Sequence, residues 1–179
     1  TQESLAMKVV SRDVLHKSDA GGVKLNLTGG AALAKAFDDI RRDVLARHPR
    51  ADIAGMLVTP MAQPGTELIV GITQDPQYGP VIMLGLGGIF VEVIRDNVFR
   101  ALPLTRIDAQ EMIAELRYQE MLNGARGAEP VDRTMLADLL LSVAGFAAAH
   151  PEIAEIDLNP VIAHGRGYSI VDARMILTN

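Results

Sequence analysis

The sequence contains no cysteine and no tryptophan, and aromatic residues make up only 4% of its 179 residues. Without cysteine there can be no disulfide, no thiolate zinc site and no cysteine nucleophile. Any chemistry in this chain therefore uses oxygen, imidazole and ammonium groups. The scarcity of aromatic side chains also argues against base-stacking platforms for single-stranded nucleic acid.

The chain also lacks a basic surplus and a long apolar run. Its net charge is -5 and its pI is near 5.3, whereas binding to nucleic-acid phosphates needs a basic face. No apolar run approaches the roughly twenty residues that span a bilayer, and no charged start precedes an apolar signal segment. We therefore expect a soluble, cytoplasmic protein with neither nucleic acid nor membrane as a partner.

Hydrophobic residues make up 49% of the chain, which is enough for one sizeable core or two small ones. Apolar periodicity and turn residues predict strands, then a helix capped by Thr28, three more strands, two helices and a closing hairpin. This order fits an α+β protein better than regular βαβ winding. We place a boundary between two subdomains near Met61 to Gly65. The expected elements are strands 5–10 and 21–27, helix 28–47, strands 53–58, 67–73 and 81–86, helices 108–121 and 131–150, and the hairpin 155–174.

The closing hairpin carries the most informative pattern. Because side chains alternate between the faces of a strand, Asp157 and Asn159 share one face and Ile156 and Leu158 share the other. A Gly-rich turn at 165–167 returns a second strand, which can bring Asp172 beside Asn159. Two carboxylates and an amide oxygen would then converge, a donor set that suits magnesium with waters and phosphates in its shell. Taken alone, such a pattern is more often an ordinary hairpin with polar residues facing water.

The loop at residues 11–22 joins the first two strands and is a candidate phosphate cover. Lys8 lies on the strand before it, and Gly21 and Gly22 end it, so backbone N–H groups could approach an anion closely. The signal is weaker than a Walker motif, and a plain Gly-Gly is common in hairpins. A lone loop histidine such as His16 is usually solvated, yet imidazole is one of the few groups here able to attack phosphorus.

Two further segments are weaker candidates. The strand that ends in Val58, Thr59, Pro60 and Met61 could offer backbone groups to a flat heteroaromatic ring, and Glu67 could accept ribose hydroxyls. The glycine cluster at 84–92 is either an anion nest or a tight bend, and we favour the bend.

Taken together and in order, these segments closely resemble the ATP-grasp domain or subunit of the ADP-forming (NDP-forming) acyl-CoA synthetases, relatives of succinyl-CoA synthetase. Five segments in register carry the resemblance, which runs from Leu5 to Leu177. They are residues 8–11, 15–25, 67–71 with 75–81, 85–92, and 157–160 with 171–174.

The resemblance implies an ATP-grasp fold, in which two α+β subdomains enclose a nucleotide cleft, here at residues 1–61 and 62–179. It implies ATP or ADP and Mg²⁺ as cofactors. Family members have further elements before the lysine strand, so we expect this chain to lack part of the N-terminal subdomain. The implied nucleotide and metal residues are Lys8 toward the phosphates, Gly21 and Gly22 in the loop over them, Val58, Thr59 and Met61 toward adenine, Glu67 toward ribose, and Asn159 and Asp172 as magnesium ligands.

The same resemblance implies the catalytic residues. His16 matches a histidine proposed to carry the phosphoryl group to or from the nucleotide, and Asp157 stands where the family has an acid close to the phosphohistidine. The implied partner is a CoA-binding domain or alpha-type subunit, which would bind the acid and CoA. One departure is Pro60 in the adenine segment, which has no N–H to donate.

Two other functions stay open at this stage. The chain could be an inactive synthetase-like regulatory region of a lysine acetyltransferase, although the presence of Lys8, His16, Asn159 and Asp172 together speaks against lost activity. It could also be another ATP-grasp ligase that activates a carboxylate without a histidine relay. The stretch 15–19 favours the acid–CoA ligase over that third reading.

Overall fold

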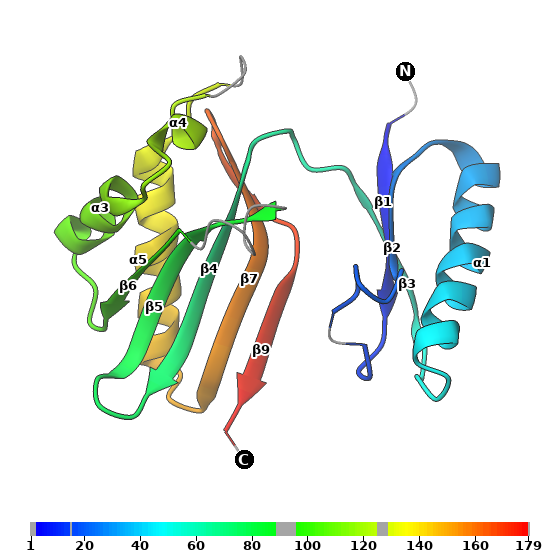
Figure 1. The fold of residues 1–179 in the computed structure, drawn as a ribbon, viewed down its shortest axis with the longest axis horizontal. Coiled ribbons are helices and arrows are strands. Elements are labelled where there is room, and N and C mark those ends of the chain that lie inside the picture. Colours follow the sequence, from blue (N-terminus) through cyan, green and yellow to red (C-terminus); the bar gives the residue numbers. More distant parts are fainter. Residues whose placement is uncertain (1–2, 15, 89–95, 125–128, 179) are drawn as a thin grey trace. The chain divides into compact units, whose positions relative to one another are not determined.

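The computed structural model describes residues 3–14, 16–88, 96–124 and 129–178 (Figure 1). The chain divides into two compact units, Thr1–Met61 and Ala62–Asn179. Each unit contains an antiparallel sheet of its own with helical cover, so the mixed α and β content that the sequence predicts is present in both.

The N-terminal unit is a three-stranded sheet with one helix. Its strands are β1 (Leu5–Val10), β2 (Val23–Leu27) and β3 (Gly55–Pro60), in the order β2-β1-β3. Helix α1 (Gly29–Arg47) packs on one face of this sheet, as Figure 1 shows. Met7 and Val9 of β1 meet Ile40 and Val44 of α1 in a small buried core. The apolar face of α1 is thus explained by one face of β1.

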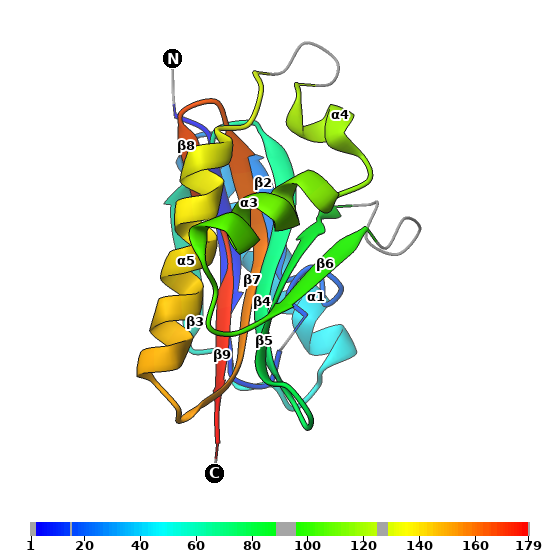
Figure 2. The ribbon, with the colours of Figure 1, turned by 90° about the vertical axis from the view of Figure 1, so that its left-hand side faces the viewer.

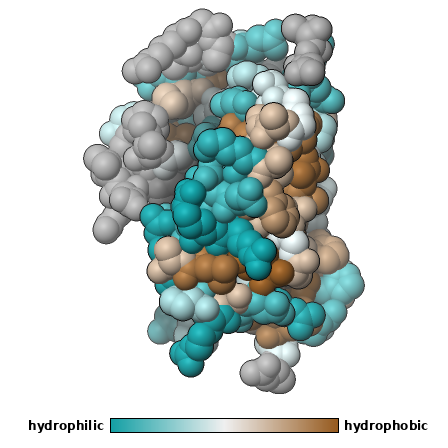
Figure 3. Space-filling model, turned by 90° about the vertical axis from the view of Figure 1, so that its right-hand side faces the viewer, coloured by the Kyte–Doolittle hydropathy of each residue, from teal (hydrophilic) through white to brown (hydrophobic). Residues whose placement is uncertain are grey.

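The start of α1 differs in one detail from the expectation. Thr28 has the extended backbone of an N-cap, but its side chain makes no capping hydrogen bond. The outer side of α1 carries charged residues such as Lys35 and Arg42, and Figure 3, which views this side, shows hydrophilic side chains gathered across the middle of the surface. The helix is therefore held by its buried face rather than by its cap.

The C-terminal unit is built on a larger sheet with the strand order β6-β5-β4-β7-β8, in which β9 also pairs with β7. Helices α3 and α5 cover one face of the sheet (Figure 2), and α4 is a single short turn after α3. The elements are β4 (Thr66–Asp75), β5 (Gly79–Leu86), β6 (Asn97–Ala101), α3 (Arg106–Glu115), α4 (Gln119–Leu122), α5 (Arg133–Ala149), β7 (Ile153–His164), β8 (Gly167–Ile170) and β9 (Ala173–Leu177).

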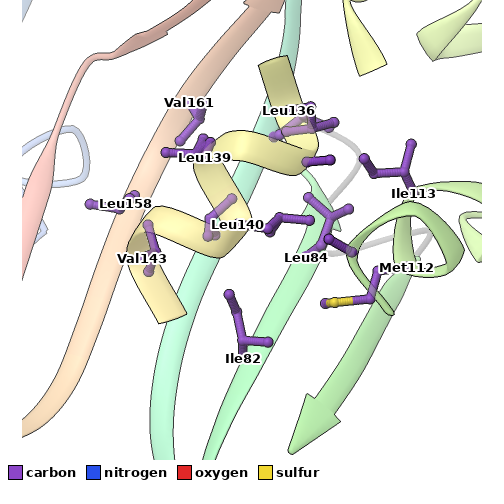
Figure 4. Close-up of a cluster of buried hydrophobic side chains, with 14 of the residues drawn as sticks. Ile82, Leu84, Met112, Ile113, Leu136, Leu139, Leu140, Val143, Leu158 and Val161 are labelled. Carbon is purple, nitrogen blue, oxygen red and sulfur yellow. The ribbon is translucent and has the colours of Figure 1, made fainter. Parts of the chain in front are cut away.

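The core of this unit lies between the sheet and helices α3 and α5 (Figure 4). Each strand contributes alternate residues to it, as period-two burial requires. The side chains labelled in Figure 4 are Ile82 and Leu84 of β5, Met112 and Ile113 of α3, Leu136, Leu139, Leu140 and Val143 of α5, and Leu158 and Val161 of β7. The opposite face of the sheet carries the remaining residues of each strand, including the polar ones of β7.

The prediction of one helix from 108 to 121 is wrong. Helix α3 ends at Glu115 because the buried Asp96 accepts hydrogen bonds from the backbone N–H groups of Arg117 (2.8 Å) and Tyr118 (3.1 Å). The side-chain amide of Gln119 donates to the carbonyl oxygens of Ile113 and Leu116. These contacts satisfy the end of the helix and turn the chain into α4.

Strand β6 was missed by the sequence analysis. Only Val98 of this strand is buried, and the strand has only five residues. Its alternation of apolar and polar residues is therefore too short to be recognised next to the glycine cluster. Several strands also differ in length: β3 starts two residues later than expected, and β4 extends through Thr66–Asp75. Residues 89–92 of the glycine cluster lie outside the described residues. Within the described part of the chain, no helix is long and apolar enough to cross a membrane.

Candidate functional site

Lys8 lies in the middle of β1 on the face that α1 does not cover. Its neighbours Met7 and Val9 point into the core beneath α1, so strand alternation directs Lys8 to the other side. Val23 of β2 and Leu57 of β3 stand opposite it in the register. The lysine is only 8% exposed. A buried ammonium is stable in a folded protein when anionic or hydrogen-bonding groups surround it.

His16 stands on the exposed part of the loop between β1 and β2, and buried residues anchor the loop on both sides. Val14 and Ala20 are 3% and 1% exposed and belong to the core beneath α1. The carboxylate of Asp13 accepts a hydrogen bond from the backbone N–H of Asp52 at 2.8 Å. The imidazole is therefore presented to solvent by a loop whose ends are fixed.

Gly21 and Gly22 are required by packing. A side chain on Gly21 would collide with Asp43 of α1, and a Cβ on Gly22 would lie 2.6 Å from Cγ1 of Val9. Their N–H groups donate within the loop, to Ser18 and Lys17 respectively. From the sequence we expected these N–H groups to approach an anion. In this structure they instead donate the hydrogen bonds that close the turn. The glycines thus shape the loop that carries His16.

The segment from Val58 to Met61 lies at the edge of its sheet. Because β3 pairs only with β1 in the strand order, the other backbone edge of β3 is not used by its own sheet. Val58 is 41% exposed, and Thr59 is half-buried. The N–H of Met61 donates to the carbonyl oxygen of Ser4 at 2.9 Å, which holds the end of this segment against the start of β1. An edge strand of this kind can offer backbone groups to a ligand.

Glu67 is an exposed residue at the start of β4, and the loop after β5 folds over it. The N–H of Gly87 donates to the carbonyl oxygen of Glu67 at 2.7 Å. A Cβ on Gly88, whose φ is +69°, would lie 2.8 Å from a carboxylate oxygen of Glu67. Gly87 and Gly88 therefore form a tight bend packed closely against Glu67, which supports the bend over the anion nest for these two residues.

Asn159 of β7 lies beside Asp172, which stands in the short connection between β8 and β9. The backbone N–H of Asn159 donates to the carbonyl oxygen of Asp172 at 3.1 Å, and the N–H of Val171 donates to Pro160. Asn159 is exposed and Asp172 half-buried. The expectation that the hairpin returns Asp172 to Asn159 is confirmed. The second arm of the hairpin is divided, because β8 ends at Ile170 and β9 begins at Ala173.

A β-bulge lies at the same position of β7. Leu68 pairs with Val161 and Val70 pairs with Leu158, so β7 has one more residue than β4 between these pairs. Bulges of this kind re-aim a side chain and are frequent beside functional sites. Ile156 and Leu158, 2% and 4% exposed, keep their predicted place in the core. The bulge follows directly after them, at Asn159 and Pro160, so that Val161 is the next buried residue of the strand.

Asp157 stands between Gly71 of β4 and Arg174 of β9 in the register. The guanidinium of Arg174 also pairs with the carboxylate of Glu155, while its Nε is buried without a hydrogen-bond partner. Arg174 therefore supplies a cation next to Glu155 and, in the register, opposite Asp157. Sequence analysis missed the role of Arg174, although its place two residues after Asp172 was a usable signal.

The donors on the hairpin fit a magnesium ion in kind. An amide oxygen from Asn159 and a carboxylate from Asp172 are hard oxygen ligands, and Mg²⁺ is usually held by one or two carboxylates plus phosphates and water. Among the described residues, no group of three or more His, Cys, Asp or Glu side chains is placed to hold a metal. An ion held here would therefore depend on phosphate oxygens of a nucleotide for part of its shell.

Comparison with known proteins places this geometry in a family. The ATP-grasp domain model matches residues 2–177. An ADP-forming acetate–CoA ligase I of Archaeoglobus fulgidus is 51% identical over 97% of the chain, and the chain spans 25% of that protein. The beta subunit of ADP-forming acetate–CoA ligase I of Pyrococcus furiosus is 46% identical, and the chain spans 75% of it. The chain belongs to the ATP-grasp domains of the ADP-forming acid–CoA ligases.

Solved structures agree with the fold of this ATP-grasp domain. It matches 76% of a chain of dinucleotide-forming acetyl-coenzyme A synthetase 1 from Ca. Korarchaeum cryptofilum, in complex with coenzyme A and Ca-AMPCP, with a TM-score of 0.92 and 48% identity over 97% of the domain. A second structure of that enzyme contains coenzyme A and Mg-AMPPCP, with its phosphohistidine segment pointing towards the nucleotide binding site. It matches 97% of the domain and 76% of its own chain, with a TM-score of 0.81 and 44% identity. The ATP-grasp fold expected from the sequence is confirmed.

Proposed function

We propose that this ATP-grasp domain transfers a phosphoryl group between ATP or ADP and His16. It does so within an enzyme that interconverts acyl-CoA, ADP and phosphate with the free acid, CoA and ATP. One observation carries the proposal: Lys8, His16, Asn159 and Asp172 are all present in a chain that matches ADP-forming ligases over nearly its whole length. A degenerate domain would have no reason to keep this combination of cation, nucleophile and oxygen donors.

The N-terminal residues act on the nucleotide. Lys8 neutralises phosphate oxygens, and its side chain lies on the face of β1 opposite α1. The backbone of Val58, Thr59 and Met61 borders adenine along the free edge of β3, with Pro60 contributing no donor. Glu67 accepts ribose hydroxyls, and the N–H of Gly87 donates to its backbone carbonyl oxygen. Gly21 and Gly22 give the loop over the phosphates its shape.

Asn159 and Asp172 hold the magnesium ion that accompanies the nucleotide. When bound, such an ion neutralises charge on phosphate oxygens and orients them for in-line displacement. The protein contributes the position of the two side chains, since their backbones are hydrogen-bonded to each other beside the β7 bulge. Two protein ligands leave the other positions to phosphates and water.

His16 is the phosphoryl acceptor. A neutral ring nitrogen uses its lone pair to form a bond to the terminal phosphorus of ATP, the bond from that phosphorus to the bridging oxygen breaks, and ADP leaves with the electron pair. The charged phosphoimidazole that results is stabilised by Asp157, which also holds the ring in the reactive tautomer before attack. The reaction runs in the other direction when ADP takes the phosphoryl group from His16.

The acid and CoA require a further part of the enzyme. The domain spans a quarter of the Archaeoglobus relative and three quarters of the Pyrococcus beta subunit. We propose that a CoA-binding domain or alpha-type subunit exchanges the phosphoryl group with His16 and forms the acyl-CoA. Coenzyme A in the structures of the Korarchaeum enzyme supports such a partner.

Labelling with γ-phosphate-labelled ATP tests this function. The protein is incubated with ATP and magnesium, with and without the CoA-binding partner, and acid-labile label is mapped by peptide analysis. We expect label on His16, no label in His16→Ala, and nucleotide binding retained in that variant. His150→Ala is the matched control, because His150 is a surface histidine of the other unit paired with Glu152.

Other outcomes point to the other functions. If the protein binds no nucleotide under any of these conditions, an inactive regulatory region is the better description. Turnover of ATP and acid with full activity in His16→Ala would instead favour a carboxylate ligase that has no histidine relay.

A further inference from the structure

The last turn of α1 is hydrogen-bonded to the loop that carries His16. Nη1 of Arg47 donates a hydrogen bond to the carbonyl oxygen of Ala20 at 3.3 Å. The N–H of Ala20 donates in turn to the carbonyl oxygen of His16 at 3.1 Å. Two successive hydrogen bonds therefore connect the guanidinium of Arg47 to the backbone of His16, although Arg47 and Ala20 are 27 positions apart in the sequence.

Ala20 is held at three points. Its side chain is 1% exposed in the core beneath α1, its N–H is bonded to His16, and its carbonyl oxygen is bonded to Arg47. A residue fixed in this way has little freedom to shift. The backbone at His16 is consequently connected by hydrogen bonds to the last turn of α1.

The packing between loop and helix is close at the next two residues. A Cβ on Gly21 would lie 2.8 Å from Cβ of Asp43 and 3.0 Å from Nη1 of Arg47. Lys24, just beyond the loop, forms an ion pair with Asp43 at 3.0 Å. Asp43 and Arg47 are one helical turn apart on α1, so one face of the helix meets the loop along its length.

We propose that Arg47 is a positioning residue for phosphoryl transfer at His16, acting through Ala20. The inference rests on the proposed function of His16. In-line transfer needs the attacking nitrogen near contact distance of phosphorus, and a shift of about 1 Å can cost about a hundredfold in rate. Arg47 does not contact the nucleotide in this role. It fixes the backbone position from which the imidazole of His16 attacks phosphorus.

A purely structural role for Arg47 predicts something different. An arginine in the last turn of a helix stabilises the helix through the macrodipole and the terminal carbonyl groups. In that case its removal lowers thermal stability and leaves the rate of transfer to His16 unchanged. The positioning role and the structural role can be separated, because the first predicts a change in the transfer rate and the second predicts a change in thermal stability alone.

The experiment compares Arg47→Met with Arg41→Met in the full protein together with its CoA-binding partner. Methionine keeps the apolar stem of the side chain and removes the hydrogen bond, while Arg41 is an exposed arginine of the same helix. Three quantities are measured: the first-order rate of label transfer to His16 at saturating magnesium and ATP, the ATP dissociation constant, and hydrogen exchange at the Ala20 and Gly22 amides. Arg47→Lys is included as the conservative variant.

We expect Arg47→Met to slow transfer by about tenfold to a hundredfold. The ATP dissociation constant should remain within about twofold, and exchange at Ala20 and Gly22 should accelerate. Arg47→Lys should recover part of the rate, and Arg41→Met should match the wild type in all three measurements. An unchanged transfer rate in Arg47→Met, in a protein whose wild type labels His16, overturns the inference. A wild type that never labels His16 overturns the proposed function instead, and the exchange data then still report whether Arg47 holds the loop.

Discussion

Asn159 and Asp172 face each other across β7 and the segment before β9, joined by a 3.1 Å hydrogen bond from the N–H of Asn159 to the carbonyl oxygen of Asp172. The β7 bulge lies at the same point of the strand, between the buried residues Leu158 and Val161. A backbone bond fixes the separation of the two side chains more firmly than side-chain packing alone would. This backbone bond brings together the two residues that we propose as magnesium ligands.

Removing either ligand should weaken the binding of magnesium with nucleotide. We expect Asn159→Ala and Asp172→Asn each to weaken the apparent magnesium affinity by about tenfold or more, because a hydrogen bond or ligand contact to a charged group contributes about 1.5–3 kcal/mol. Titration calorimetry with an ATP analogue over a series of magnesium concentrations measures this. Ser169→Ala on β8 is the control, and an equal loss in that variant would mean that the hairpin, not the ligand set, had been disturbed.

Gly22 should tolerate no side chain, whereas Gly30 should. A Cβ on Gly22 would lie 2.6 Å from Cγ1 of Val9 and 2.9 Å from the backbone oxygen of Lys17, so Gly22→Ala forces a shift that costs about 1–3 kcal/mol. Gly30 lies in α1 with open space around its Cβ position, and Gly30→Ala should stabilise the helix by up to about 1 kcal/mol. Urea denaturation of both variants measures whether each substitution lowers or raises the free energy of unfolding. An unchanged free energy in Gly22→Ala would contradict the packing described for the loop.

Asp96 should contribute far more to stability than a surface aspartate. It is 4% exposed and accepts the N–H groups of Arg117 and Tyr118, so Asp96→Ala leaves two donors without their acceptor and should cost about 2–4 kcal/mol. Asp138 pairs with Arg106 at the surface, and Asp138→Ala should cost at most about 1 kcal/mol. Thermal and urea unfolding compare the two. Similar losses would show that the turn after α3 is held by other contacts.

The ion pair of Asp43 should make stability depend on pH in the acid range. The hydrogen bond from Lys24, followed by that from Arg42, lowers the pKa of the Asp43 carboxyl from its ordinary value. A carboxyl with a lowered pKa in the folded state stabilises the fold fully above its unfolded pKa of about 4, and the contribution is lost as the pH falls through the folded pKa.

Asp43→Asn removes this contribution and reveals its pH dependence. At pH 7 the variant should melt at a lower temperature than the wild type, and the difference should shrink as the pH is lowered below about 4. Scanning calorimetry between pH 2 and pH 7 measures the difference. A gap that widens in acid would have the wrong sign for a carboxylate stabilised by cations.

Local pattern was sufficient for the elements whose partners are near in sequence. The hairpin that joins Asn159 to Asp172 follows from strand alternation and a short glycine turn, because both are properties of neighbouring residues. The long helices α1 and α5 follow from apolar periodicity in the same way. The candidate residues of the nucleotide site were likewise found from ordered segments of sequence and their resemblance to one family.

Other features depended on contacts that a linear pattern does not contain. Helix α3 ends where it does because Asp96, about twenty residues earlier, captures the N–H groups of Arg117 and Tyr118. Strand β6 is too short to stand out until β5 lies beside it.

By itself, the sequence determined which side chains are available for chemistry, the faces on which the strand residues lie, and the family to which the chain belongs. The tertiary structure decided why Gly21 and Gly22 must be glycines, where Arg174 stands beside Asp157, and that Arg47 reaches the loop of His16. The physical reason is the distance along the sequence over which each kind of interaction acts. Periodicity and turn preference act over a few residues, whereas a hydrogen bond or a collision between residues twenty or more positions apart exists only after the chain has folded.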